Sequence, residues 1–187
     1  MNKIISILDI VHDTTVDGPG FRTTIYAAGC AHRCLECHNP QSWDKNNGIL
    51  HSTRSLLDDV KKSDFANVTF SGGDPLMQVD AFTELARLIR IETNKTIWCY
   101  TGFVYEQVIR SPKYSQILPY IDVLVDGPYI HTLNDESLRF RGSSNQRLID
   151  VQASLKNDRL TLWNDGLYIE FSQLYSQCKG VRETASF

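Results

Sequence analysis

The sequence contains neither a long apolar run nor an excess of basic residues. A membrane-spanning helix needs about 20 consecutive apolar residues, and a basic surface is the usual mark of a nucleic-acid partner. The formal net charge is −3, so we expect neither a membrane nor a nucleic acid as partner. Residues 1–10 also lack the basic start, long apolar middle and cleavage site of a signal peptide. We therefore expect a cytoplasmic protein.

Internal repeats, low-complexity tracts and linkers rich in Gly, Pro and Ser are also missing from the chain. Its 187 residues suit one domain with a sizeable core. The composition, with 42% hydrophobic and 22% charged residues, is that of an ordinary globular protein.

Cysteine is scarce and unevenly placed, with five residues of which three fall within residues 30–37. An odd, clustered set does not fit a disulfide framework, which is usually even and spread along the chain. In a reducing compartment such clustering indicates metal ligation. Cys99 lies in an apolar run and is expected to be a small buried hydrophobe, and Cys178 receives no role.

Hydrophobic periodicity predicts strands that alternate with helices. Strands are expected at residues 21–28, 67–70, 96–100 and 121–125, and helices at residues 53–62, 80–92 and from residue 105 to 109. Ser52 is a candidate cap for the first of these helices. This alternation implies right-handed crossovers and an α/β fold with a mostly parallel sheet.

The polar and glycine-rich loops all follow predicted strands, so they should meet at the carboxyl edge of the sheet, where α/β folds bind ligands. Four to six strand–helix units would form a partial barrel rather than a complete one of eight. Beyond residue 150 the alternation weakens. Residues 160–163 and 167–171, separated by Asn-Asp-Gly, suggest a hairpin.

The cysteine loop, residues 29–40, offers Cys30, Cys34 and Cys37 at close spacing. Three thiolates from one loop can hold three corners of an iron–sulfur cube and leave the fourth iron open to an outside ligand. The alternative at this stage is structural zinc, with His32 or His38 as the fourth ligand. The three-then-two spacing is unusual for zinc ribbons, which favour paired Cys-x-x-Cys knuckles.

The C-x3-C-x2-C loop after the first predicted strand resembles the hallmark of the radical S-adenosylmethionine superfamily. Two further strings, Asp17-Gly18-Pro19-Gly20-Phe21-Arg22 and His38-Asn39-Pro40 with Trp43, resemble the glycyl-radical-enzyme activases. Three more strings narrow the resemblance to the branch that activates anaerobic ribonucleoside-triphosphate reductase: Ser71-Gly72-Gly73-Asp74-Pro75-Leu76, Val123-Leu124-Val125-Asp126-Gly127 and Arg141-Gly142-Ser143-Ser144-Asn145-Gln146. The resemblance spans residues 8–150.

The resemblance implies a radical SAM fold, a partial (βα)6-type barrel with a core over residues 1–150 and an extension of unknown role over residues 151–187, packed on that core. It assigns Cys30, Cys34 and Cys37 to a 4Fe–4S cluster whose open fourth iron binds S-adenosylmethionine.

The resemblance also implies which residues bind S-adenosylmethionine. Gly72 and Gly73 suit a close approach of backbone to ligand, and Asp74 adds a carboxylate nearby. The remaining expected binding residues are Glu36, Cys37, His38, Thr101 and Asp126. Glu36 departs from the pattern, because the superfamily usually has an aromatic residue there. Arg141 and Asn145 are candidates for contact with the ligand or the partner protein.

The implied reaction is reductive cleavage of S-adenosylmethionine followed by abstraction of a hydrogen atom from a glycine, which leaves a glycyl radical. The implied partners are the large subunit of anaerobic ribonucleoside-triphosphate reductase and a reduced flavodoxin or ferredoxin as electron donor. Two alternatives stay open: activation of another glycyl radical enzyme such as pyruvate formate-lyase, and a non-catalytic, zinc-stabilised interaction domain.

Overall fold

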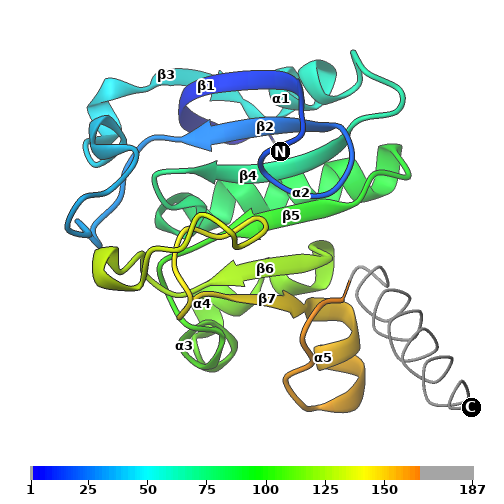
Figure 1. The fold of residues 1–187 in the computed structure, drawn as a ribbon. Helices are drawn as coiled ribbons and strands as arrows, with labels where there is room; N and C mark the ends of the chain where they lie inside the picture. Colours follow the sequence, from blue (N-terminus) through cyan, green and yellow to red (C-terminus); the bar gives the residue numbers. More distant parts are fainter. Residues whose placement is uncertain (1, 165–187) are drawn as a thin grey trace, which may run out of the picture.

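The computed structural model describes residues 2–164, which form one open, seven-stranded sheet with helices on one side (Figure 1). The strand order is β3-β1-β2-β4-β5-β6-β7. The strands are β1 (Ile4–Thr14), β2 (Arg22–Ala27), β3 (Ile49–Ser52), β4 (Asn67–Gly72), β5 (Ile97–Tyr100), β6 (Val123–Asp126) and β7 (Arg147–Asp150). The α-helices are α1 (Thr53–Val60), α2 (Val79–Glu92), α3 (Tyr105–Arg110), α4 (Pro112–Ser115) and α5 (Val151–Asn157).

The four central strands, β2, β4, β5 and β6, are parallel, whereas β1, β3 and β7 run antiparallel to their neighbours. The predicted mostly parallel α/β sheet is therefore confirmed. Within the described residues the sheet is open, because its outer strands β3 and β7 lie at opposite edges. The carboxyl ends of the parallel strands share one edge, as the crossover rule requires.

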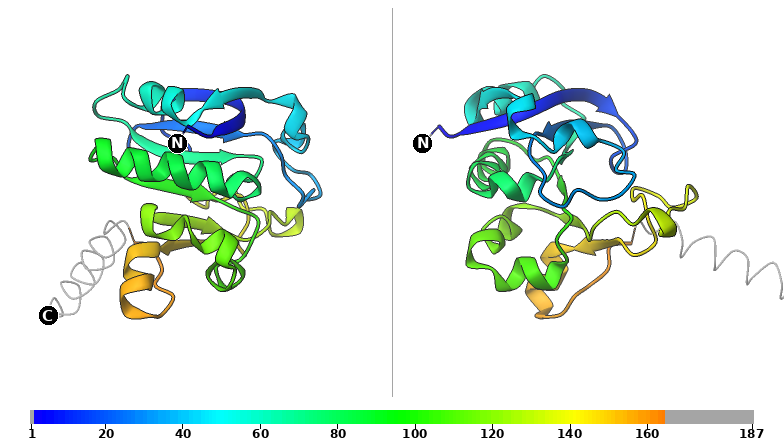
Figure 2. Two further views of the ribbon diagram at one scale, coloured as in Figure 1. Left: turned by 180° about the vertical axis from the view of Figure 1, so that it is seen from behind. Right: turned by 90° about the vertical axis from the view of Figure 1, so that its left-hand side faces the viewer.

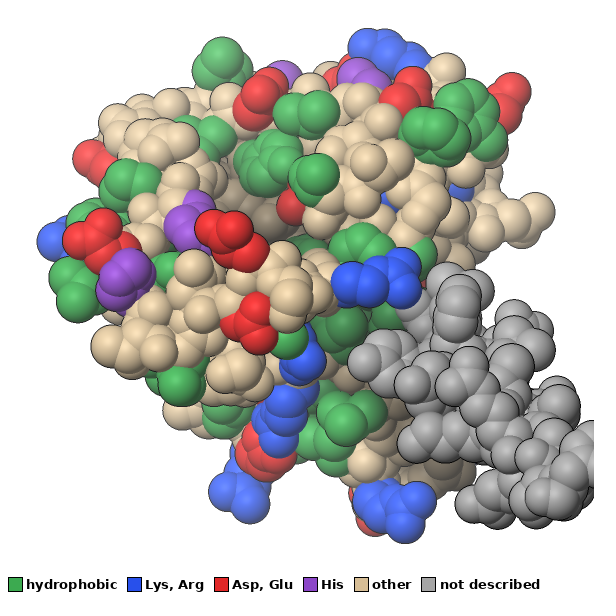
Figure 3. Space-filling model, viewed as in Figure 1, with side chains coloured by type: hydrophobic (Ala, Val, Ile, Leu, Met, Phe, Trp, Pro, Cys, Tyr) green, Lys and Arg blue, Asp and Glu red, His purple; other side chains and the backbone are tan. Residues whose placement is uncertain are grey.

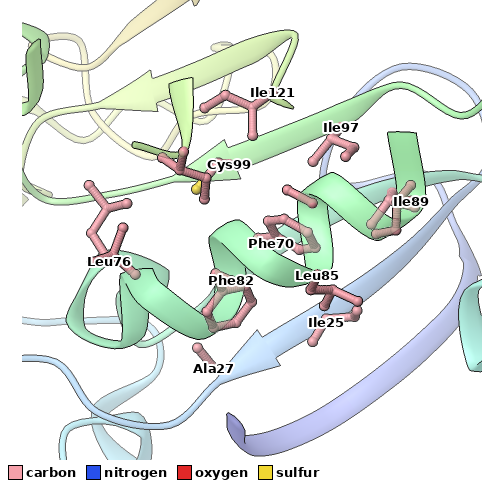
Figure 4. Packing of buried hydrophobic residues seen from close by; sticks show 14 of the residues in the cluster. Ile25, Ala27, Phe70, Leu76, Phe82, Leu85, Ile89, Ile97, Cys99 and Ile121 are labelled. Atoms are coloured by element: carbon pink, nitrogen blue, oxygen red, sulfur yellow. The ribbon is translucent and has the colours of Figure 1, made fainter. Parts of the chain in front are cut away.

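One face of the sheet packs against α1 and α2 and contains the main apolar core (Figure 4). Alternate residues of each strand point to this face, and α2 presents Phe82, Leu85 and Ile89 toward them at helical spacing. Phe70 and Phe82 meet edge to face with ring centroids 5.0 Å apart. Ser52 caps α1 as predicted, its side chain accepting a hydrogen bond from the Ser55 N–H.

The opposite face of the sheet is covered by chain segments without regular helices, residues 15–21 and 127–146 (Figure 2). Near β5 and β6 it has a small apolar cluster around Trp98. Near β2 and β4 it is polar and contains Arg22, whose side chain is fully buried. The Arg22 guanidinium donates to the Thr69 hydroxyl at 2.6 Å and lies 5.3 Å from the Trp98 ring. Burial lowers the pKa of Arg22 to about 10.

The predicted strands and helices are all present, with ends shifted by a few residues. The sequence patterns did not identify β1, β3, β7, α4 and α5. Residues 160–163, expected as half of a hairpin, lie beside β7 through the Ile149–Leu162 bridge, whereas the other half, residues 167–171, lies outside the described residues. Cys99 is buried in the core as expected. No helix in the described part of the chain is long and apolar enough to cross a membrane.

Candidate active site

A cavity of about 770 Å³ opens at the carboxyl edge of the parallel strands. Its wall brings together the ends of β2, β4 and β5, the cysteine loop and residues 127–146. Of the residues expected to form a site, it includes Cys30, Cys34, Cys37, His38, Gly72, Gly73 and Thr101. The molecular surface is hollowed on the face shown in Figure 3, with acidic and histidine side chains around the hollow.

The cysteine loop follows the end of β2, and backbone hydrogen bonds hold its first two residues in place. The Gly29 N–H donates to the Ser42 carbonyl at 2.7 Å, and the Cys30 N–H donates to the Trp43 carbonyl at 3.1 Å. Farther out, Arg33 and Glu36 have φ angles of 47° and 54°. This left-handed conformation is unfavourable for residues other than glycine. Residues that adopt it are often found at functional sites. The loop therefore holds its three thiols in a conformation that the backbone does not favour by itself.

Backbone N–H groups lie near the sulfur atoms of Cys30, Cys34 and Cys37. Burial raises the pKa of Cys30, and the N–H groups of His32 and Arg33 oppose that rise. Burial likewise raises the pKa of Cys34, and the Tyr129 N–H opposes it. The Asn39 N–H donates to the Cys37 sulfur at 3.4 Å. At Cys30 and Cys34 these N–H groups reduce the rise in pKa that burial causes, and so act in favour of the thiolate, the form that binds metal.

Gly72 and Gly73 line the cavity, and close packing of the backbone also requires glycine at both positions. A Cβ atom on Gly72 would meet the Ala27 backbone at 2.5 Å, and one on Gly73 would meet the Gly29 carbonyl oxygen at 2.6 Å. Gly72 also has a φ of +94°, which glycine adopts readily. The two glycines thus allow the end of β4 to pack directly on the base of the cysteine loop.

Asp74 is fully buried behind the cavity wall rather than exposed in it. Its carboxylate accepts hydrogen bonds from the Leu76 N–H, the Thr101 hydroxyl, the Gly102 N–H and the His32 ring, over 2.7–3.1 Å. A buried carboxylate is tolerated only when its oxygens are satisfied in this way. Asp74 therefore connects the ends of β2, β4 and β5 instead of presenting a free charge to a ligand.

Asp126 is likewise buried and does not line the cavity. Its carboxylate accepts from the Tyr105 N–H at 2.6 Å and from the Arg147 guanidinium at 3.0 and 2.5 Å. The same guanidinium binds Glu106, and these two hydrogen-bonded carboxylates raise the pKa of Arg147. Asp126 therefore joins β6 to β7 and α3, and its expected role in binding S-adenosylmethionine remains a prediction.

Glu36 is exposed and lies outside the cavity wall, whereas its neighbours Cys37 and His38 line it. A second groove of about 420 Å³ adjoins the cavity and shares Asp17, His38, Tyr100 and Gly142 with it. Arg141 lines this groove and donates to the Gln146 carbonyl at 2.6 Å. Asn145 donates to the Pro128 carbonyl at 2.8 Å.

Three contributors to the site were not identified from the sequence. Tyr26, on β2, lines the cavity and donates its hydroxyl to the Asp17 carboxylate, and burial raises its pKa. Tyr129 lies against His38, with ring centroids 4.7 Å apart. His32, weighed only as a zinc ligand, instead bonds Asp74. The alternation of β2 already placed Tyr26 on the face opposite Ile25, but no local signal pointed to Tyr129.

The donor set fits an iron–sulfur cluster. Three half-buried cysteines of one loop line one cavity, backbone N–H groups oppose the rise in pKa at Cys30 and Cys34, and the Asn39 N–H donates to the Cys37 sulfur. Among the described residues, no three His, Cys, Asp or Glu side chains are arranged to hold a single metal ion.

Comparison with known proteins agrees with this donor set. Residues 16–149 match the model of the 4Fe–4S single cluster domain family. The chain is 35% identical over 139 residues to the anaerobic ribonucleoside-triphosphate reductase-activating protein of Haemophilus influenzae, covering 70% of this chain and 88% of that protein.

Two further activating proteins with the same name match to a similar degree. The protein of Escherichia coli (strain K12) is 36% identical, over 70% of this chain and 89% of its own. The protein of Enterobacteria phage T4 is 34% identical, over 71% of this chain and 86% of its own. The match to the family model includes the whole cysteine loop and the strand ends around the cavity. The chain therefore belongs to the family of anaerobic ribonucleoside-triphosphate reductase-activating proteins.

Proposed function

We propose that this protein activates an anaerobic ribonucleoside-triphosphate reductase by cleaving S-adenosylmethionine and generating a glycyl radical on the reductase. The observation that carries the proposal is the placement of Cys30, Cys34 and Cys37 in one cavity with Gly72 and Gly73. Family membership supports the target of this proposal, since the relatives are named as activating proteins of that reductase. On this proposal the open sheet is the partial (βα)6-type barrel of the radical SAM fold.

Cys30, Cys34 and Cys37 would hold three irons of the 4Fe–4S cluster and leave the fourth iron for S-adenosylmethionine. When bound, the cluster supplies the electron that divides S-adenosylmethionine into methionine and a 5′-deoxyadenosyl radical. The backbone of residues 72–73 would bind the methionine end. Since Asp74 and Asp126 are already fully bonded inside the protein, their part is to fix the strand ends that shape the cavity.

The glycine of the reductase would reach the cavity from its open side. The adjoining groove gives a segment of a large protein room beside the cavity, and Asp17 and Tyr100 line both spaces. Abstraction of one hydrogen atom then yields 5′-deoxyadenosine and a glycyl radical. A reduced flavodoxin or ferredoxin as electron donor, and a cytoplasmic location, remain predictions that follow from the same assignment.

The direct test is electron paramagnetic resonance of the anaerobically reduced protein with and without S-adenosylmethionine. We expect a cluster signal that changes when S-adenosylmethionine is added, and a glycyl radical signal once the reductase is present. A radical on pyruvate formate-lyase but not on the reductase would reassign the target. A colourless protein that contains zinc, lacks iron and leaves S-adenosylmethionine intact would contradict the enzymatic function.

A further inference from the structure

His32 projects from the cysteine loop into the wall of the cavity, between the loop and the end of β4. Its Nε2 lies 2.7 Å from Asp74 Oδ2, and the two side chains are 17% and 1% exposed. A hydrogen bond in such a buried place is strengthened by the low local dielectric. His32 is therefore the point at which a side chain of the cysteine loop is attached to the neighbouring strand end.

The His32 ring is fixed by packing as well as by this bond. A Cβ atom on Gly102 would meet the ring at 2.4 Å, so the backbone after β5 lies directly against it. On another side the Phe103 ring meets it edge to face, with centroids 4.7 Å apart. The ring thus has one position, set by β5 as well as by β4.

His32 makes a connection that the other hydrogen-bond partners of Asp74 do not make. The Leu76 N–H, the Thr101 hydroxyl and the Gly102 N–H all belong to β4, β5 or the turns that follow them. Only the bond from His32 reaches the Asp74 side chain from the cysteine loop. Loss of the histidine would leave Asp74 with three donors and the strand ends joined, while the loop kept the attachments near its base and its contacts with Tyr129.

We propose that His32 is a positioning residue that sets the cysteine loop relative to residues 72–73, and so the cluster relative to its ligand. This inference rests on the proposed function. It predicts that His32 matters more for binding of S-adenosylmethionine than for stability or for iron content. Some residues orient metal ligands without binding the metal themselves. Replacing such a residue typically lowers affinity or activity by about 10–100-fold.

The test compares His32→Leu with His32→Gln in the anaerobically reconstituted full chain. Leucine retains bulk but cannot donate a hydrogen bond, whereas the glutamine amide can still donate to Asp74. The dissociation constant of S-adenosylmethionine, followed by the change it causes in the cluster signal, should rise about tenfold in His32→Leu. It should stay within about threefold of the wild-type value in His32→Gln. Iron content and thermal midpoint should change little in either variant.

Two further variants sharpen the test. Gly102→Ala adds a methyl group against the ring and should weaken binding in the same direction without removing the histidine. His51→Gln, a half-buried histidine on β3 outside the cavity, should behave as wild type. Unchanged binding in His32→Leu would overturn the proposal, as would loss of iron equal to that of Cys30→Ala.

Failure of this inference can be distinguished from failure of the proposed function. A wild-type cluster signal that does not respond to S-adenosylmethionine would contradict the proposed function. A wild-type response that His32→Leu retains in full would contradict only the positioning role.

Discussion

The two faces of the sheet are built from the same strands but have different roles. In β2, Ile25 and Ala27 point to the helix-covered face and join the apolar core, whereas Arg22 and Tyr26 point to the loop-covered face. In β4, Phe70 lies on the first face and Thr69 on the second. Successive residues of one strand alternate in direction, so one strand supplies stability with one set of residues and a polar site with the other.

The two faces therefore separate residues that mainly stabilise the fold from residues that shape the functional site. The helix-covered face is mainly apolar, and most of its residues need only suitable shape and hydrophobicity. The loop-covered face buries the side chain of Arg22, which needs specific partners. Substitutions on the first face should therefore change stability, and those on the second should change function.

The largest effect should come from the cysteine loop. Cys30→Ala, Cys34→Ala or Cys37→Ala should each abolish cleavage of S-adenosylmethionine, because each removes a cluster ligand. Iron content and formation of 5′-deoxyadenosine measure this. Cys178→Ala, outside the described residues, should leave both nearly intact. Equal loss in all four variants would mean that the ligand assignment is wrong.

On the helix-covered face, Phe82→Ala should lower the free energy of unfolding by about 3–5 kcal/mol, because it leaves a cavity against Phe70. Denaturant titration measures the change. The folded fraction should still bind iron. Ile91→Ala, on the same helix but 65% exposed, is the matched control and should change stability by less than about 0.5 kcal/mol. A similar loss in both variants would contradict the assignment of this face to stability.

On the loop-covered face, Tyr26→Phe removes the hydrogen bond to Asp17 at the cavity. Stability should fall by only about 1 kcal/mol, while the glycyl radical yield on the reductase should fall about tenfold, since small errors in positioning slow a reaction strongly. Unfolding curves and radical signals measure the two effects. Tyr120→Phe, which packs against the main core, should leave the radical yield unchanged. A stability loss without a change in radical yield would argue against a functional face.

The smallest effect should come from Glu84, a buried carboxylate on the helix-covered side. Burial raises the pKa of Glu84. Hydrogen bonds from the Lys3 N–H and the Thr53 hydroxyl lower it by more than this rise, so the pKa lies below the usual 4.5. A carboxyl group with a lowered pKa adds stability above its unfolded-state pKa and loses that contribution as the pH falls.

Glu84→Gln should therefore be less stable by about 1 kcal/mol at pH 7, and the difference should narrow as the pH falls below 4.5. Denaturant titrations at several pH values measure this. Glu136→Gln, an exposed position on the other side, should give the wild-type pH dependence. A difference that is independent of pH would contradict the ionised state of Glu84.

The helix-covered face could be predicted from the sequence because its signals are local. The spacing of Phe82, Leu85 and Ile89 predicted α2, and the apolar run of β6 predicted a buried strand. The unpredicted strands lacked such signals. β1 is interrupted by irregular register and is largely exposed beyond Ile7. β7 is held in place by Arg147, whose partner Asp126 lies in another strand.

The site could be predicted only in part for the same reason. Clustering in the sequence was enough to bring Cys30, Cys34 and Cys37 together at one cavity. The burial of Asp74 could not be inferred, because its partner His32 is 42 positions away and Thr101 is 27 positions away. Spacing within a motif says nothing about such distant partners.

The single carboxylate of Asp74 also has a consequence for how this family can diverge. Its hydrogen bonds join residues from three separate chain segments, so a change at one of them alters the requirement at the others. In an alignment of homologues, positions 32, 74 and 101 should therefore covary, and a longer acidic side chain at position 74 should be accompanied by a different residue at position 32. Substitutions at these three positions should therefore occur together during evolution rather than one at a time.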